Sequence, residues 1–242
     1  MPPYRSLPGA SGVSGLGLAD PASAGRWGDL RLRIASAVVL APLGLGAIWV
    51  GGWWFAAIAA AVGVGIAWEW ARMCRRRAPA LILGFGYVAC AVAGLVWLRG
   101  DIGAGRSNVV FLVLVVWASD IGAYATGRWV GGAKLAPAIS PGKTWSGAAG
   151  GLIAAILVGV AGSSAGGYAS GGFLAGGLGL VAQSGDLAES ALKRHFGVKD
   201  SGALIPGHGG LLDRLDGLLA VAGVATIIAA LMGRGVRLWQ WQ

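Results

Sequence analysis

The most highly charged stretch of this 242-residue sequence, residues 185–216, carries side chains that could perform phosphoryl chemistry. If its first part is helical, spacings of three and four place four polar residues on one face, namely Asp186, Glu189, Ser190 and Lys193. Asp213 and Asp216 are likewise three residues apart on the following segment. Between them, Pro206-Gly207-His208-Gly209-Gly210 predicts a tight loop. Two helices joined in this way can direct carboxylates toward one another.

These residue types indicate a metal and a phosphate substrate. Carboxylates with few His or Cys neighbours favour a hard, oxygen-binding cation, and we predict Mg²⁺ as the cofactor. Cations suited to phosphate oxygens stand in the same stretch: Lys193, Arg194, Lys199 and Arg214. Together they are typical of phosphoryl or nucleotidyl transfer. The alternative is that the charges pair with one another and hold helices together, but the density of charge around one loop favours the chemical interpretation.

A second polar cluster, Ser-Pro-Gly-Lys-Thr-Trp, occupies residues 140–145. Its Gly-Lys-Thr triplet suggests a P-loop, but that motif requires Gly five residues before the triplet, where Pro137 stands, and we expect no strand before it. The backbone and Lys143 can still bind phosphate, while Ser140 and Thr144 can cap a helix that begins near residue 145. The alternative is a helix start and interface anchor without a ligand.

The composition indicates an integral membrane protein of one domain. Hydrophobic residues make up 56% of the chain and charged residues 12%, against about 25% charged in soluble domains. The two Cys exclude a disulfide framework or a Cys-rich zinc site. The net charge of +9 does not indicate nucleic-acid binding, because the basic residues punctuate long apolar stretches instead of forming a stripe.

The apolar segments predict an all-α fold, a polytopic helical bundle with about seven spans. Each is near the roughly 20 residues that cross a bilayer, and they cover 34–50, 53–70, 80–98, 108–126, 147–162, 173–189 and 211–232. An eighth or ninth span is the alternative count. The Gly-, Ser- and Pro-rich residues 1–25 predict a mobile tail, which leaves 26–242 as the membrane-embedded catalytic domain.

The flanking charges predict the orientation. With the N-terminus in the cytoplasm, thirteen Lys and Arg residues fall inside: Arg26, Arg31, Arg33, Arg72, Arg75, Arg76, Arg77, Arg128, Lys134, Lys143, Lys193, Arg194 and Lys199. Four fall outside, namely Arg99, Arg106, Arg234 and Arg237. This bias follows the positive-inside rule, and it brings the acidic residues toward the cytoplasmic face. An ion-coupled transporter is disfavoured because the acids gather on one side and no inverted repeat of spans is visible.

Three further features lie within or beside the apolar segments. Asp120 falls inside the fourth segment, where an ionisable group is costly and therefore a functional candidate. Glu69, between two Trp residues, is predicted to be an anchor at the inner edge and not a catalyst. Close helix contacts are predicted at two small-residue pairs, Gly147/Gly151 and Gly172/Gly176.

At the charged stretch the sequence resembles the phosphatidate cytidylyltransferases, also called CDP-diacylglycerol synthases. The resemblance rests on Ser190-x-x-Lys193-Arg194, Lys199-Asp200-x-Gly202 and Pro206-Gly207-His208-Gly209-Gly210-x-x-Asp213-Arg214-x-Asp216. Further similar motifs are Gly51-Gly52-Trp53-Trp54-Phe55, Trp68-Glu69-Trp70-Ala71-Arg72, Asp120-x-x-Ala123-Tyr124 and residues 140–145. The resemblance spans roughly 26–232, and Ser146 departs from it, since relatives often carry Glu or Gln there.

The resemblance implies a reaction in which CTP and phosphatidate give CDP-diacylglycerol and pyrophosphate with Mg²⁺. It implies Asp186 and Asp213 as metal ligands, and these two with Lys193 as the catalytic set. It implies that substrates are bound by Asp120, Ser140, Lys143, Thr144, Ser190, Arg194, Lys199, Asp200, His208, Gly209, Arg214 and Asp216. A CTP-dependent polyprenol kinase is the alternative enzyme. The expected location is a bacterial inner membrane with the active site facing the cytoplasm; a homodimer is the assembly to test.

Overall fold

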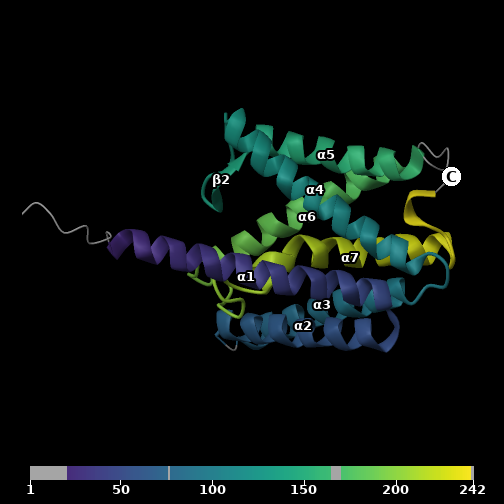
Figure 1. Ribbon diagram of the computed structural model, residues 1–242, viewed down its shortest axis with the longest axis horizontal. Helices are drawn as coiled ribbons and strands as arrows, with labels where there is room; N and C mark the ends of the chain where they lie inside the picture. The colour runs from purple at the N-terminus through teal and green to yellow at the C-terminus, as the bar shows by residue number, and fades with distance from the viewer. Residues whose placement is uncertain (1–20, 76, 165–169, 241–242) are drawn as a thin grey trace, which may run out of the picture.

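The computed structural model describes residues 21–75, 77–164 and 170–240, and these form a helical bundle. Its helices are α1 (Pro21–Val50), α2 (Gly52–Met73), α3 (Ala78–Arg99), α4 (Gly105–Trp129), α5 (Trp145–Ser164), α6 (Ser170–His195) and α7 (Leu212–Met232). A short 3₁₀ helix, η1 (Leu238–Gln240), follows. Most of the helices run along the long axis of the molecule, whereas α4 and α6 cross it obliquely (Figure 1). Each of the seven predicted apolar segments lies largely in one of these helices.

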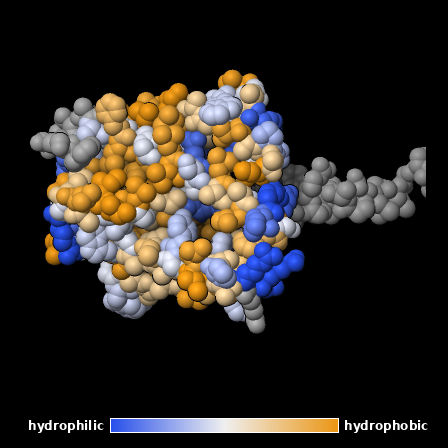
Figure 2. Space-filling view, turned by 180° about the vertical axis from the view of Figure 1, so that it is seen from behind, coloured by the Kyte–Doolittle hydropathy of each residue, from blue (hydrophilic) through white to orange (hydrophobic). Residues whose placement is uncertain are grey.

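The helical fold is confirmed and its apolar helices are those of a membrane protein, whereas the number of spans stays a prediction. Among the described residues, five helices are long and apolar enough to cross a bilayer: α2, α3, α4, α5 and α7. The apolar part of α1 is shorter, Val38–Val50, and α6 carries charged residues along its second half. Large hydrophobic side chains such as Leu83, Phe173 and Leu231 are exposed. Figure 2 shows hydrophobic surface between hydrophilic residues gathered toward the two ends of the molecule.

The all-α prediction omitted a short antiparallel hairpin between α4 and α5. Its strands are β1 (Lys134–Ala136) and β2 (Ser140–Thr144), with Lys134 opposite Thr144. Residues 140–144 are therefore a strand, and only Thr144 acts as the predicted cap: its Oγ1 accepts a hydrogen bond from the Gly147 N–H at 3.1 Å. Ser146, where the family resemblance is interrupted, donates its Oγ–H to the Gly131 carbonyl and so ties α5 to the residues before the hairpin.

Small residues bring α4, α5 and α6 into close contact, as predicted for the two glycine pairs. A Cβ on Gly151 would lie 2.6 Å from the Ser119 carbonyl oxygen of α4, and one on Gly176 would lie 2.9 Å from Ile156 of α5. Gln183 of α6 adds a polar link, because its Nε2 donates to Ser119 Oγ at 3.1 Å and to the Ala148 carbonyl at 3.2 Å. These three helices thus form a closely packed half of the bundle.

The two predicted sides of the membrane correspond to opposite ends of the bundle. At one end Arg99 donates to the Ile48 carbonyl at 2.6 Å, and Arg106 lies 4.4 Å from the centre of the Trp49 ring. At the other end lie the hairpin and the loop between α6 and α7, and α1 projects past the bundle there (Figure 1). Residues 21–25, predicted as part of the tail, belong to α1, and residues 1–20 lie outside the described part of the chain.

Candidate active site

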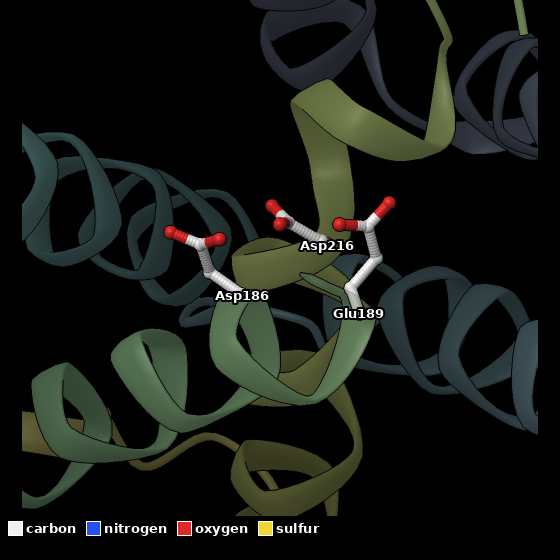
Figure 3. A group of neighbouring side chains, drawn as sticks. All are labelled: Asp186, Glu189 and Asp216. Atoms are coloured by element: carbon white, nitrogen blue, oxygen red, sulfur yellow. The ribbon is translucent and has the colours of Figure 1, made fainter. Parts of the chain in front are cut away.

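Three carboxylates from two helices meet at the hairpin end of the bundle. Asp186 and Glu189 project from α6 and Asp216 from α7, and their carboxylate groups face one another (Figure 3). Ligand oxygens of the three lie within 4.8 Å of one another. Asp186 and Asp216 were predicted site residues, whereas Glu189 was noted only as a member of the same helix face. Glu189 lies three residues after Asp186, and this helical spacing could have identified it as a site residue.

Lys193 joins the two helices beside this cluster. Its Nζ lies 2.7 Å from Glu189 Oε2 and donates a hydrogen bond to Asp213 Oδ1 at 2.8 Å. Asp213 also accepts hydrogen bonds from the backbone N–H groups of Ser201, at 3.0 and 3.2 Å, and Gly210, at 3.1 Å. The carboxylate of Asp213 is therefore held by four contacts from α6 and the preceding loop, so its position is fixed by the fold.

A polar cavity of about 530 Å³ lies between α4, the hairpin, α5 and α6. Its charged and polar lining residues are Asp120, Tyr124, Arg128, Lys143, Thr144, Gln183 and Asp186. The Lys143 ammonium lies 2.7 Å from Asp186 Oδ2, so β2 and α6 are linked at the wall of the cavity. Sequence reasoning had used Arg128 only as a topology signal. It lies eight residues after Asp120, two helical turns along the same face, and this spacing could have identified it.

A smaller cavity of about 340 Å³ connects the predicted metal ligands. Its charged lining residues are Asp120, Asp186, Lys193, Asp213, Arg214 and Asp216. Asp186 and Asp213, predicted to hold a metal together, therefore face one cavity. Among the residues that the structure describes, Asp120 and Asp216 have no ion-pair partner. The cavity thus has an excess of carboxylate over ammonium and guanidinium groups, which suits a cation.

An apolar cavity of about 690 Å³ opens on the other side of α6. Its walls come from α2, α3, α6 and α7, and include Leu83, Tyr87, Leu180 and Leu192. Glu189 and Asp216 are its two carboxylates, so it reaches the carboxylate cluster. Figure 2, which views the molecule from behind, shows hydrophilic residues in a hollow between hydrophobic side chains.

Several predicted substrate ligands either do not line the three cavities or direct their side chains to the backbone. Arg194 donates to the Ile139 carbonyl at 3.2 Å and thereby holds the hairpin. Arg214 lines the small cavity but directs Nε and Nη2 to the His208 carbonyl, at 3.0 and 2.6 Å. The remaining members are Ser140, Ser190, Lys199, Asp200, His208 and Gly209, of which Lys199 and Asp200 are exposed. Their contact with substrate stays a prediction.

The chain is similar to known bacterial enzymes over most of its length. It is 39% identical to a phosphatidate cytidylyltransferase from Brucella suis biovar 1 over 84% of this chain and 94% of the relative. A phosphatidate cytidylyltransferase from Rickettsia felis is 36% identical over 84% of this chain and 93% of its own. One from Haemophilus influenzae is 42% identical, over 58% of this chain and 53% of its own.

The model of the cytidylyltransferase family matches residues 78–232. That range begins at the first residue of α3 and ends at the last residue of α7, so it contains the hairpin and all five site carboxylates. The resemblance seen in the motifs is thereby confirmed. The chain belongs to the cytidylyltransferase family.

Proposed function

We propose that the protein transfers the cytidylyl group of CTP to phosphatidate, giving CDP-diacylglycerol and pyrophosphate. The observation that carries the proposal is that a polar and an apolar cavity meet at one carboxylate cluster. Asp186 lines the polar cavity, Asp216 lines the apolar one, and both line the small cavity between α4, α6 and α7. A water-soluble nucleotide and a lipid can therefore approach the same point from opposite sides of α6.

The polar cavity is the proposed nucleotide site. Lys143 and Arg128 supply positive charge on its wall, which suits the triphosphate oxygens. Because Lys143 contacts Asp186 at 2.7 Å, its ammonium stands between the cavity and the carboxylate cluster. It can therefore orient a phosphate that lies next to Asp186.

The apolar cavity is the proposed site for the acyl chains and glycerol of phosphatidate. Leu83 and Leu180 on its walls are also exposed on the outside of the bundle, so the lining continues into the surface that faces lipid. The lipid phosphate would then lie at the polar end beside Glu189 and Asp216. An anion is unfavourable next to two carboxylates without a cation between them, which makes a metal necessary to this proposal.

We propose Mg²⁺ as that cation. The donor set fits it, since the small cavity offers only carboxylate oxygens as metal ligands and hard divalent cations prefer these. Asp186 and Asp213, which both line this cavity, are the proposed ligands, and Asp216 of the same cavity has a carboxylate oxygen within 4.8 Å of one of Asp186. A bound Mg²⁺ would neutralise negative charge on the phosphate oxygens.

The transfer needs no general base from the protein. A phosphate monoester is already an anion near neutral pH, so its oxygen can attack the α-phosphorus of CTP directly. The new bond joins the lipid phosphate oxygen to the α-phosphorus, and the bond from the α-phosphorus to the β-phosphate oxygen breaks to release pyrophosphate. The carboxylates around the reacting phosphates are oriented by two lysines. Lys143 contacts Asp186, and Lys193 contacts Glu189 and Asp213.

The proposed location is a bacterial inner membrane with the hairpin end in the cytoplasm, where CTP is made. Support comes from the bias of basic residues toward that end and from the bacterial relatives. A homodimer stays a prediction, which the mass of the purified protein in detergent would check.

Product analysis with labelled CTP tests the function. We expect label from the α-phosphate of CTP to enter the lipid fraction when phosphatidate and Mg²⁺ are present. Label from the γ-phosphate in lipid would instead identify a CTP-dependent polyprenol kinase. No label in lipid from either position would contradict both enzymes and leave the ion-coupled transporter as the hypothesis.

A further inference from the structure

Glu69 is a buried carboxylate that the proposed reaction does not use. It lies on α2, one turn before the end of that helix, and is 2% exposed. Among the described residues it has no ion-pair partner. A buried charge is costly unless it is paired or hydrogen-bonded, so its partners show what it does.

Within the described part of the chain, the hydrogen bonds of the Glu69 carboxylate all come from the segment between α6 and α7 or from the start of α7. Its Oε2 accepts from Ser201 Oγ–H at 3.2 Å and from the Leu212 N–H at 2.9 Å. Its Oε1 accepts from the Leu204 N–H at 3.3 Å. The approach is close: a Cβ on Gly202 would lie 2.5 Å from Oε1. One side chain of α2 therefore holds both ends of a twelve-residue stretch, residues 201–212.

The contact with Leu212 supplies a cap to α7 from another helix. Leu212 is the first residue of α7, and the preceding N-cap position is Leu211, whose side chain cannot accept a hydrogen bond. The first N–H groups of a helix need acceptors, and the positive end of the helix dipole favours a carboxylate. The Glu69 carboxylate supplies both the acceptor and the negative charge, and it does so at the residue before Asp213.

The contact with Ser201 leads to the same carboxylate. The Ser201 hydroxyl donates to Glu69, while the Ser201 N–H donates to both oxygens of Asp213. Asp213 in turn accepts from Lys193 at 2.8 Å. Glu69 thus holds Leu212, the residue immediately before Asp213, and Ser201, whose N–H donates to Asp213. The position of Glu69 therefore decides where the Asp213 carboxylate lies relative to α6.

We propose that Glu69 is a positioning residue, which sets Asp213 and Lys193 in the geometry that nucleotidyl transfer requires. This role rests on the proposed function. The negative charge is essential, because the carboxylate accepts hydrogen bonds from three donors and has no proton to donate. In Glu69→Gln the amide NH₂ must face at least one N–H or O–H donor, so the shape is kept and a hydrogen bond is lost.

The test compares Glu69→Gln, Ser201→Ala and the double variant with Asp101→Asn as a matched control. Asp101 also accepts a hydrogen bond from a distant backbone group, the Gly235 N–H at 2.9 Å, but this bond is exposed and lies at the opposite end of the bundle. We expect Glu69→Gln to lower kcat about tenfold with KM for CTP changed less than about threefold. Ser201→Ala should lower kcat less, and the double variant should match Glu69→Gln because both act through one contact. Asp101→Asn should keep kcat and lose thermal stability.

Hydrogen exchange of the metal-free, substrate-free protein supplies a readout that does not depend on the reaction. In Glu69→Gln we expect faster exchange of the amides of residues 201, 204 and 212, while Asp101→Asn leaves them unchanged. A kcat within about twofold of the wild type in Glu69→Gln would overturn the proposal. It would also be overturned if Asp101→Asn lost kcat to the same extent at a similar loss of thermal midpoint. If Glu69→Gln does not fold, Ser201→Ala decides, and an unchanged kcat there overturns the proposal.

The labelled-CTP assay of the wild type distinguishes a failure of this inference from a failure of the proposed function. If the wild type places no label from CTP in lipid, the function has failed, and the exchange measurement still reports whether Glu69 holds the segment. If the wild type is active and the variants equal it, only the positioning role has failed.

Discussion

Lys193 sits where two helices present carboxylates to each other, and it binds Glu189 of α6 and Asp213 of α7 at once. The spacing of residues predicted which polar groups share a face of α6. It could not predict which groups pair across helices, since that depends on the packing angle and on side-chain direction. For this reason Glu189 was not predicted as a site residue, although it belongs to the carboxylate cluster that the structure forms.

The proposed metal ligands make the sharpest residue-scale prediction. Asp186→Asn and Asp213→Asn keep shape but remove the charge that a divalent cation requires. We expect each to lower Mg²⁺-dependent turnover by at least about a thousandfold, and the double variant to be scarcely worse than either single one, because both act through one ion. Turnover and melting temperature are measured together. Near-normal turnover in either variant would remove that residue from the metal site.

Lys143 makes a second prediction at this scale. If it contacts a phosphate of CTP beside Asp186, Lys143→Ala should lower kcat/KM by about ten- to a hundredfold. Lys143→Arg should recover only part of the loss, because a planar guanidinium cannot replace a compact ammonium in the 2.7 Å contact with Asp186. Steady-state kinetics with varied CTP checks this. Unchanged kinetics in the Ala variant would assign residues 140–145 a structural role alone.

At the scale of elements, hydropathy located all seven helices but not the hairpin. A helix of 20 or more apolar residues gives a strong signal, whereas β2 has five residues, two of them Pro141 and Gly142, which disfavour strands. The sequence thus indicated a helix start where the chain forms a strand. Among the described residues, α1 and α6 are not apolar over a long enough stretch to be candidate spans, and both carry polar residues at the hairpin end, Ser36 on α1 and Asp186 on α6.

Close packing of α4 on α5 is a testable property of these elements. A Cβ on Gly122 would lie 2.6 Å from Ala154 Cβ and 2.8 Å from the Gly150 carbonyl oxygen, so Gly122→Ala must push the helices apart. We expect a loss of about 1–3 kcal/mol in the free energy of unfolding, read as a lower thermal midpoint in detergent. Gly177→Ala is the control, since nothing lies within 4 Å of its Cβ position and Ala favours a helix. Equal midpoints would show that this interface can absorb a methyl group.

At the scale of the whole molecule, charge and structure agree on two distinct ends. Arg99, Arg106 and Arg234 contact backbone or Trp rings near one end. The carboxylate cluster, the hairpin and the α6–α7 loop form the other, together with most of the basic residues. A sequence can predict this division because each charge only has to fall on the correct side of an apolar segment. Which end faces the cytoplasm is then a matter for experiment.

Cysteine labelling in intact spheroplasts measures that orientation. In a background with Cys74→Ala and Cys90→Ala, Ile102→Cys places a thiol between α3 and α4, where the side chain is 93% exposed. Ala203→Cys places one in the exposed part of the α6–α7 loop at the opposite end. Because the basic residues concentrate at the hairpin end, a membrane-impermeant maleimide should label position 102 at once and position 203 only after permeabilisation. The reverse pattern would put the carboxylate cluster on the side of the membrane that lacks CTP. Labelling of both positions in intact spheroplasts would mean that the two ends share one side, which would contradict the predicted seven-span arrangement, in which α4, α5 and α6 all cross the membrane between the two positions.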